Sequence, residues 1–412
     1  MRPIEPEQYI QRPYEFFCKH REKDPVAWID FFHGEQVWLV TGYEEAEAMM
    51  KDTRFVRDGS RLSDPGSRQA KIPDKVQQVM AMKNNMILVR DAPFHTRVRG
   101  LLGKAFTPAM IRQLQPSIEA IAAALLREMS GKRQHELIAD FAYRLPMYVI
   151  SDLIGVPQED RHYSQRWSEA FISFIDFHRT MDELDRASDE MLHAREYFKE
   201  LVASKRRHPV DDIVSHLAML QDEGGPITEE EIVASCVLLL SAGHETTVNL
   251  IANGYYLLLR HPEQCRRLQE DWSLLPNAVE EMLRYEPPAL TSSRWVSEDI
   301  EFYGHTLRKG QFVIIALGGA NRDPRAMTEP DRFDIGRKPV KHLSFASGAH
   351  YCLGAPLARL EGLIAIKMLV SHLKHPILLE EPVWKNSIAL RGFQSLQIAA
   401  EVDMQDARVS QN

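Results

Sequence analysis

Phe345-Ala346-Ser347-Gly348-Ala349-His350-Tyr351-Cys352-Leu353-Gly354 is the stretch that decides the fold of this chain. Glycines stand on both sides of the cysteine, so the backbone can pass close to a flat partner without a Cβ in the way. The residues that follow predict a helix, with Pro356 suited to its first turn. A helix N-terminus offers free N–H groups and a partial positive charge, which favour the thiolate that ligates metals. The stretch therefore predicts that Cys352 is a metal ligand.

The alternative is that Cys352 is a small buried apolar side chain, as most free cysteines are. The spacing Phe-x-x-Gly-x-His-x-Cys-x-Gly, however, resembles the heme-ligand loop of the cytochrome P-450 monooxygenases. The resemblance implies that Cys352 is the proximal ligand of heme iron, that His350 contacts a heme propionate and that Phe345 packs beside the sulfur. Ala346 departs from the family pattern, in which glycine is frequent at this position, and adds a methyl group near the cofactor.

Composition and charge narrow the class of protein. The 412 residues include 44% hydrophobic and 26% charged residues, and the net charge of −8 argues against general nucleic-acid binding. Four cysteines without Cys-x-x-Cys spacing make a disulfide framework or a zinc site unfavourable, and they suit a reducing compartment. The sequence shows neither a signal peptide nor an apolar run of about 18 residues, so we expect a cytoplasmic protein without a membrane anchor.

No linker or internal repeat divides the chain, so residues 1–412 are predicted to form a single domain. The most linker-like segment, residues 57–68, is short and charged, and we interpret it as a mobile loop within that domain. Short runs rich in β-branched and apolar residues at 36–41 and 311–316 predict strands. The expected architecture is mostly α with small β sheets, an α+β class, and the resemblance implies the cytochrome P-450 fold with a long central helix over the heme.

Residues 228–260 form the clearest predicted helix. Thr228 and Glu231 make a capping box, and the run ends where Pro262 prevents its continuation. A helix of this length spans about 48 Å, enough to cross a domain. Its first half is apolar on every side, so it should be buried.

Ala242-Gly243-His244-Glu245-Thr246-Thr247 interrupts this apolar run. One interpretation is a surface patch in which Thr246 bonds a carbonyl one turn back. The hexapeptide also resembles the oxygen-activation motif of the same family, in which a groove of small residues admits dioxygen. The resemblance assigns the catalytic acid–alcohol pair to Glu245 and Thr246, and it assigns no role to His244 or Thr247.

Cationic and imidazole side chains are expected at the two heme propionates. In Asp91-Ala92-Pro93-Phe94-His95-Thr96-Arg97-Val98-Arg99 the resemblance assigns His95 and Arg99 to them, and it also assigns Arg294 in the predicted strand. Glu281 and Arg284 lie three residues apart on one helix face, a pair that on a surface contributes little. The resemblance adds Arg332 and implies a buried network of three residues that braces the heme loop.

These assignments predict a heme-thiolate monooxygenase with heme b, which inserts one oxygen atom of O₂ into a hydrophobic small molecule by hydroxylation or epoxidation. The chain has no flavin or iron–sulfur segment, so electrons from NAD(P)H would arrive through a ferredoxin or flavodoxin. That partner is expected on a basic face formed by Lys104, Arg112, Lys338, Lys341 and Arg359. A peroxide-driven peroxygenase and a non-enzymatic heme-thiolate sensor are the alternatives, and neither needs the intact Glu245–Thr246 pair.

The substrate itself cannot be read from the sequence. By family position the pocket is expected to be lined by residues before 90, by residues 170–178 and by Ala289–Thr291. These segments are apolar and include adaptable methionines, which suits a lipid-like, terpenoid or polyketide substrate. Phe171 and Phe174, at helical spacing, are as well explained by a place in the core.

Overall fold

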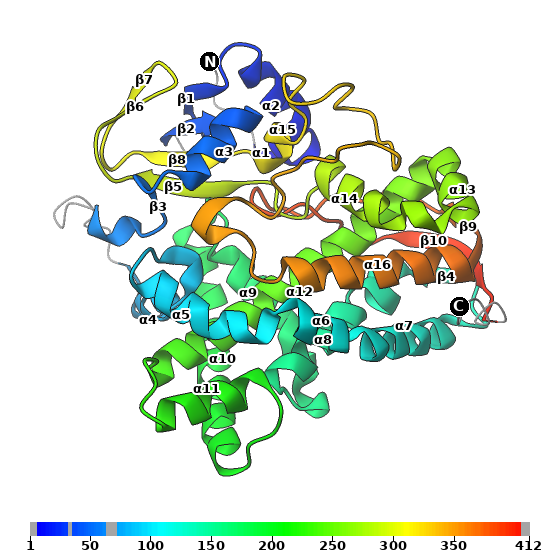
Figure 1. Ribbon diagram of the computed structural model, residues 1–412, viewed down its shortest axis with the longest axis horizontal. Helices are drawn as coiled ribbons and strands as arrows, with labels where there is room; N and C mark the ends of the chain where they lie inside the picture. The colour runs from blue at the N-terminus through cyan, green and yellow to red at the C-terminus, as the bar shows by residue number, and fades with distance from the viewer. Residues whose placement is uncertain (1–5, 32–34, 63–71, 405–412) are drawn as a thin grey trace.

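Helices dominate the computed structural model, which describes residues 6–31, 35–62 and 72–404 (Figure 1). The α-helices are α1 (Pro6–Gln11), α2 (Pro13–Arg21), α3 (Tyr43–Lys51), α4 (Asp74–Lys83), α5 (Phe94–Leu102), α6 (Pro108–Gln113), α7 (Gln115–Met129), α8 (Arg144–Ile154), α9 (Ser164–Ser173), α10 (Met181–Arg207), α11 (Ile213–Asp222), α12 (Glu229–Arg260), α13 (Pro262–Glu270), α14 (Leu275–Tyr285), α15 (Leu317–Ala320) and α16 (Ala355–His372). Short 3-10 helices are η2 (Gly59–Arg61), η3 (Ile87–Val89), η4 (Gly103–Phe106), η6 (Gln158–Tyr163), η7 (Trp272–Leu274) and η8 (Gly348–His350), and η5 (Ile138–Ala142) is a π-helix.

Three small sheets complete the fold. The strands are β1 (Val26–Asp30), β2 (Gln36–Val40), β3 (Phe55–Val56), β4 (Gln134–Glu136), β5 (Ser292–Val296), β6 (Ile300–Phe302), β7 (His305–Leu307), β8 (Phe312–Ile315), β9 (Leu373–Leu378) and β10 (Gln397–Val402). The largest sheet has the order β1-β2-β8-β5-β3, in which only β2 and β8 run parallel. The other sheets are β4-β10-β9 and the hairpin β6-β7. The predicted mostly α class with small sheets is confirmed, and both predicted strands are present as β2 and β8.

The long helix α12 is the central element. Thr228 caps it with the full capping box, in which the Thr228 hydroxyl accepts from the Glu231 N–H and the Glu231 carboxylate accepts from the Thr228 N–H. The helix ends at Arg260, and Pro262 then begins α13. Helices α8, α9, α10, α14 and α16 pack around α12, which buries its apolar first half as predicted.

The cysteine loop lies in front of α12 and leads directly into α16, beside α5 (Figure 1). Arg97 of α5 forms an ion pair with Glu231 of α12, with Nη2 and Oε1 2.6 Å apart, so α5 is fixed to the start of the central helix. At the start of the predicted mobile loop, the N–H groups of Arg57 and Asp58 donate to the Asp91 carboxylate, whereas residues 63–68 lie outside the described residues. No helix in the described part of the chain combines the length and the apolar composition that a membrane span requires.

Candidate functional site

Cys352 is positioned by backbone contacts at the start of α16. Its N–H donates to the carbonyl oxygen of Phe345 at 2.9 Å, which closes the loop. Burial raises the pKa of the Cys352 thiol, whereas hydrogen bonds from the N–H groups of Gly354 and Ala355 act in the opposite direction. The nearby charges of Arg99 and Arg359 also favour the thiolate. The predicted placement of the cysteine at a helix N-terminus with Pro356 in its first turn is confirmed.

Phe345 and Arg359 form the outer wall of this loop. The Arg359 guanidinium lies 4.4 Å from the centre of the Phe345 ring. It also donates to the Glu280 carboxylate at 2.6 and 2.9 Å and to the Tyr351 hydroxyl at 3.0 Å. Burial by itself would raise the pKa of Glu280, but hydrogen bonds from His342 and Arg359 lower it to about 2. The Arg359 guanidinium therefore stabilises the loop through contacts with Phe345, Tyr351 and Glu280.

The loop backbone contains two left-handed residues. Ala346 has φ of 58° and Gly348 has φ of 71°. A Cβ on Gly348 would lie 2.5 Å from the carbonyl oxygen of Met50, so this glycine allows close approach of the protein's own backbone. The expectation that Gly348 makes room for a flat cofactor is therefore corrected. Gly354 meets no protein atom within 4 Å at the Cβ position, which leaves space on its side of the cysteine.

His95 and His350 lie together at the other end of the site. Their ring centroids are 4.2 Å apart, and His350 Nε2 is 3.5 Å from Oδ1 of Asp91. Burial lowers the pKa of both imidazoles, that of His350 to about 4, so both are neutral near pH 7. His95 Nε2 is buried and has no hydrogen-bond partner among the described residues. It is therefore free to bond to a further group.

Arg294 is buried in β5, with one guanidinium nitrogen, Nη1, bonded to the carbonyl oxygen of Ser293 at 2.7 Å. Its other terminal nitrogen, Nη2, has no hydrogen-bond partner within the described ranges. Burial, followed by repulsion from Arg57, lowers the pKa of Arg294 to about 9. Such a group requires an anion, because a buried unpaired charge is unfavourable.

Arg57 is a member of this site that the sequence did not reveal. Its guanidinium donates to the carbonyl oxygens of Leu88 and Ser293 at 2.8 and 2.9 Å, and burial lowers its pKa to about 10. Arg57 lies in the charged segment interpreted as a mobile loop, where nothing in the sequence separates it from a surface arginine. Arg99 of α5 lies beside the cysteine loop, and its Nη2 donates to the carbonyl oxygen of Tyr351 at 2.5 Å.

The middle of α12 presents an opening in an otherwise buried helix. Ala242 is exposed and Thr246 is partly exposed, although the residues before and after this turn are buried. The Thr246 hydroxyl donates to the Ala242 carbonyl oxygen at 2.8 Å, so its oxygen can still accept a hydrogen bond. A Cβ on the partly exposed Gly243 would lie 3.2 Å from Ile150 of α8, so the glycine allows α8 to approach closely here. His244 is fully buried and bonded to the Tyr143 carbonyl oxygen, in agreement with its having no assigned role.

Glu245 forms a partly buried ion pair that the sequence did not predict. Lys385 Nζ lies 2.5 Å from Oε1 of Glu245, and the two residues are 140 positions apart in the chain. The Glu245 side chain is almost fully buried, whereas that of Lys385 is one-third exposed. The pair therefore connects the centre of α12 to the protein surface.

The ion-pair framework differs from the prediction in one residue. Glu281 and Arg284 form a fully buried bidentate pair, with oxygen–nitrogen distances of 2.7 and 2.8 Å. The third member of the network is Arg337, whose Nε lies 3.2 Å from Oε1 of Glu281. Arg332 points to the surface and pairs with Glu329, so the assignment of Arg332 to the network was wrong. Only the backbone carbonyl of Arg332 contributes, as an acceptor for Arg284 and Arg337.

Several side chains expected at a substrate pocket are part of the core. Met82, Met86, Phe171 and Phe174 are buried in one hydrophobic cluster with α12. Leu290 belongs instead to the cluster beneath α1 and α2. Met80 is 37% exposed.

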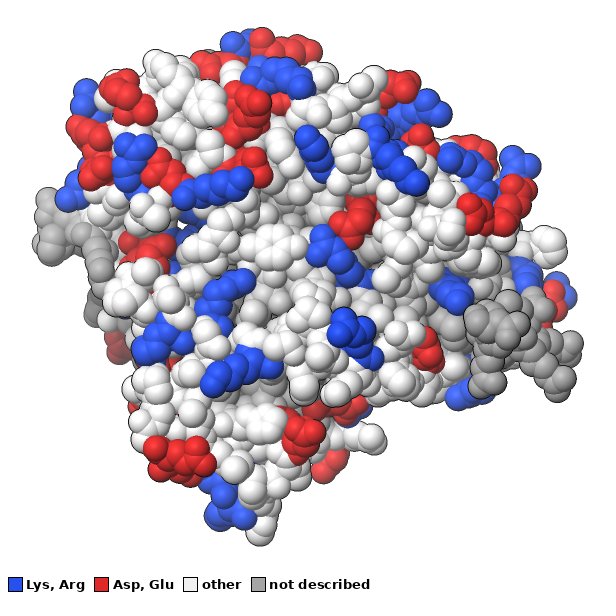
Figure 2. Space-filling model, in the orientation of Figure 1, with Lys and Arg blue, Asp and Glu red and all other residues white. Residues whose placement is uncertain are grey.

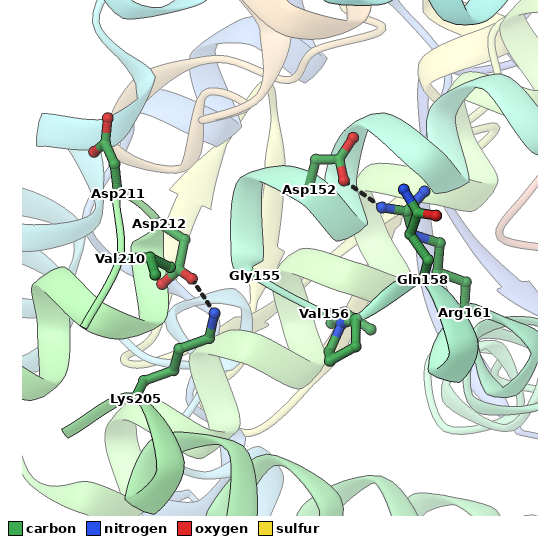
Figure 3. Close-up of a pocket in the computed structure, with 10 residues that line it drawn as sticks. Asp152, Gly155, Val156, Gln158, Arg161, Lys205, Val210, Asp211 and Asp212 are labelled. Carbon is green, nitrogen blue, oxygen red and sulfur yellow. Dashed lines mark hydrogen bonds and ion pairs between the residues drawn. The ribbon is translucent and has the colours of Figure 1, made fainter. Parts of the chain in front are cut away.

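A depression of about 350 Å³ lies away from Cys352, where the end of α8 meets the end of α10 (Figure 3). Its charges are already paired, Lys205 with Asp212 at 2.6 Å and Arg161 with Asp152 (Figure 3). This depression brings together none of the predicted site residues.

The groups around Cys352 fit a flat, dianionic metal macrocycle. One thiol lies at a helix start, and two buried nitrogens, His95 Nε2 and Arg294 Nη2, have no hydrogen-bond partner among the described residues. Asp91 lies beside the cationic Arg57, but its oxygens also accept from backbone N–H groups and His350. The local excess of positive charge matches the two carboxylates of heme.

Comparison with known proteins gives a consistent answer. A family model described as cytochrome P-450 matches residues 8–390. A biotin biosynthesis cytochrome P-450 of Bacillus subtilis is 42% identical over 366 residues, covering 89% of this chain and 90% of that protein. The 6-deoxyerythronolide B hydroxylase of Saccharopolyspora erythraea is 36% identical, with coverage of 93% and 95%.

Solved structures agree with these relatives. A cytochrome P-450 in complex with an acyl carrier protein bearing hexadec-9Z-enoic acid superposes with a TM-score of 0.89 at 40% identity, covering 96% of this chain and all of that chain. A myxobacterial cytochrome P-450 in complex with myristic acid gives a TM-score of 0.87 at 35% identity, with coverage of 96% and 98%.

Proposed function

This chain belongs to the cytochrome P-450 family and is a monooxygenase of that family, and we propose that it oxidises a hydrophobic small molecule with O₂ and with electrons from a separate ferredoxin or flavodoxin. The family implies heme and O₂. The observation that carries the proposal is the set of unpartnered groups around Cys352, namely His95 Nε2 and Arg294 Nη2. These groups complement a heme propionate, and the thiol beside them complements iron.

In this proposal Cys352 would hold the iron of heme b as a thiolate ligand, and its electron density would favour oxygen activation. His95, His350, Arg99 and Arg294 hold the propionates. When bound, heme supplies the redox centre at which dioxygen is activated. We assign Arg57 to the same propionate-binding group, because its guanidinium lies between the carbonyl oxygens of Leu88 and Ser293. Phe345 covers the sulfur and keeps water away from it.

On the α12 side, Thr246 and Glu245 handle protons. The Thr246 hydroxyl donates to its own helix, so its oxygen can accept a hydrogen bond from a water molecule at this face of α12. Lys385 holds the Glu245 carboxylate in place and links it to solvent. A positioned acid–base pair of this kind contributes about 10²–10⁴-fold to a proton-transfer step.

The basic face supports an acidic electron donor. Lys and Arg side chains gather over α5, α6 and the start of α16, where few acidic side chains are visible (Figure 2). Lys104, Arg112, Lys338 and Lys341 are exposed, whereas Arg359 forms an ion pair with Glu280.

Two solved relatives support a long apolar chain as the substrate. One is in complex with an acyl carrier protein bearing hexadec-9Z-enoic acid, and the other is in complex with myristic acid.

The decisive experiment compares wild type with Cys352→Ala after expression with heme supply. The wild-type ferrous–CO complex should show the red-shifted Soret band of thiolate ligation, and the variant should lack it. Turnover of a fatty acid should require O₂, NAD(P)H and a reductase–ferredoxin pair. Turnover with hydrogen peroxide alone at an equal rate, or a variant that keeps the band, would contradict the proposal.

A further inference from the structure

Lys83 is a basic residue that the proposed mechanism does not use. It is the last residue of α4, on the same helix face as Val76 and Val79, which are fully buried. The Lys83 side chain is half-buried, and its Nζ lies 2.5 Å from the carbonyl oxygen of Phe174 and 5.7 Å from the centre of the Phe174 ring. Phe174 is the C-cap of α9.

This ammonium group lacks an anionic partner. An ammonium has three N–H donors, and only the Phe174 carbonyl is recorded as an acceptor. No carboxylate within the described ranges forms a salt bridge with Lys83, and its charged neighbour is the cation Arg57. Burial, with a further contribution from Arg57, lowers the pKa of Lys83 to about 8. A half-buried ammonium with one acceptor among the described residues has N–H donors left for an anion.

The heme propionates do not account for Lys83. They are matched by His95, His350, Arg99 and Arg294, which lie on α5, the cysteine loop and β5. Lys83 instead connects α4 to the end of α9, and α4 packs against α10 and α12. Lys83 contacts Phe174, which belongs to the same hydrophobic cluster as the neighbouring Met82 and Met86. An unpaired cation in apolar surroundings is suited to one charged end of an otherwise apolar molecule.

We propose that Lys83 binds the carboxylate of the substrate, so that the enzyme selects long-chain carboxylic acids over neutral molecules of the same shape. The proposal rests on the proposed monooxygenase function and adds the head group of its substrate. The two remaining N–H groups of Lys83 donate to the carboxylate oxygens, while Phe174 keeps its own hydrogen bond. Anchoring at this point fixes which carbon of the chain reaches the face of α12 that carries Thr246.

The test uses the ferric holoprotein and three ligands of one chain length: tetradecanoic acid, its methyl ester and tetradecan-1-ol. Binding is followed by the shift of the Soret band. A charge-assisted hydrogen bond is worth about 10- to 100-fold in affinity, so wild type should bind the acid more tightly than the ester by that factor. Lys83→Met should lose the preference with the ester affinity unchanged, and Lys83→Arg should retain most of it.

Lys75 supplies a matched control on the same helix. It is exposed and pairs with Asp189 at 2.6 Å, so Lys75→Met should leave all three affinities unchanged. Equal loss of acid and ester binding in Lys83→Met would show that Lys83 only caps α9, and would overturn the proposal. A wild-type protein that binds the ester as tightly as the acid, as a carrier-bound acyl chain would require, would also overturn it. In both cases a normal CO band with ester oxidation would leave the monooxygenase function intact.

Discussion

At the scale of single residues, Thr246 and Thr247 offer a direct comparison. Both hydroxyls donate to a carbonyl one turn back, Thr246 to Ala242 at 2.8 Å and Thr247 to Gly243 at 3.1 Å. Only Thr246 is partly exposed on the open side of α12, because Thr247 is buried. The predicted hydrogen bond from the Thr246 hydroxyl to a carbonyl one turn back is therefore present. The hydroxyl oxygen can still accept a second hydrogen bond.

Thr246→Ala should keep the CO spectrum and the substrate-induced shift, while product formation per NAD(P)H consumed falls. The loss of an acid–base contribution of about 10²–10⁴-fold in proton delivery lets release of hydrogen peroxide compete. Parallel assays of NAD(P)H, product and peroxide measure this uncoupling. Thr247→Ala is the control and should remain coupled. If both variants form the same amount of product per NAD(P)H consumed, Thr246 has no role in proton delivery.

Ala346 carries backbone strain beside the cysteine. Its φ of 58° is unfavourable for a residue with a Cβ by roughly 1–2 kcal/mol. Ala346→Gly should therefore stabilise the protein by about 1 kcal/mol after the entropy of the unfolded glycine is subtracted. Denaturant unfolding of the holoprotein measures the change. Gly348→Ala should act in the opposite direction, because its Cβ would collide with Met50.

At the scale of elements, the network between α14 and residues 329–337 holds the approach to the cysteine loop. Glu281 accepts from Arg284, from Arg337 and from the N–H of Asp334 at 3.0 Å. Asn321 and Ser344 continue these bonds to the segment before Cys352. The network therefore connects a helix end to the loop that holds the cysteine.

Arg337→Met should lower the thermal midpoint and the heme content, since it leaves Glu281 and three backbone carbonyls short of a donor. Breaking a buried ion pair costs about 3–5 kcal/mol, and the effect here should be smaller because the pair Glu281–Arg284 remains. Arg332→Met should change stability by less than about 1 kcal/mol, as expected for an exposed pair. A larger loss of stability in Arg332→Met would support the assignment of Arg332 to the network with Glu281 and Arg284.

Helix α16 contains a buried acid whose charge state couples stability to pH. Glu361 is 1% exposed, one of its carboxyl oxygens has no recorded partner, and burial raises its pKa to about 8. The folded state therefore holds a proton that the unfolded state releases near pH 4.5. The stabilising effect of this proton is fully present below pH 4.5 and is lost as pH rises toward 8.

Glu361→Gln should be more stable than wild type at pH 7 by up to roughly 3 kcal/mol, because the amide has no proton to lose. The advantage should shrink as pH falls and vanish below about pH 4.5. Urea unfolding between pH 5 and 8 gives the two profiles. Parallel profiles would show that Glu361 is charged in the folded protein.

At the scale of the whole molecule, a net charge of −8 coexists with a basic face around α5, α6 and η4 (Figure 2). The uneven distribution steers an acidic partner to this face at low salt. At 0.1 M ionic strength charges more than about 10 Å apart are largely screened, so added salt should weaken the attraction of the partner to this face.

Lys104→Glu combined with Arg112→Glu should slow reduction of the iron by ferredoxin at low salt, and the difference should shrink as salt is added. Stopped-flow reduction measures the rate. The matched control reverses Lys23 and Lys309, two exposed lysines away from this face. If both double variants slow reduction equally, net charge and not the basic face is responsible.

The sequence by itself determined the features that depend on neighbouring residues. The spacing around Cys352, the capping box of α12, its end before Pro262, and strands β2 and β8 all arise from hydrogen bonds and side-chain periodicity within a few positions. The sequence also placed the Glu281–Arg284 pair, since residues three apart share a helix face.

Only the tertiary structure decided which distant charges meet. Arg337 replaces Arg332 beside Glu281, Lys385 reaches Glu245 across 140 positions, and Arg57 and Lys83 turn inward from polar segments. An arginine or lysine in a charged stretch has the same local pattern whether it faces water or the interior. The outcome depends on which segments approach it when the core forms, because burial and the available partners fix the energy of its charge.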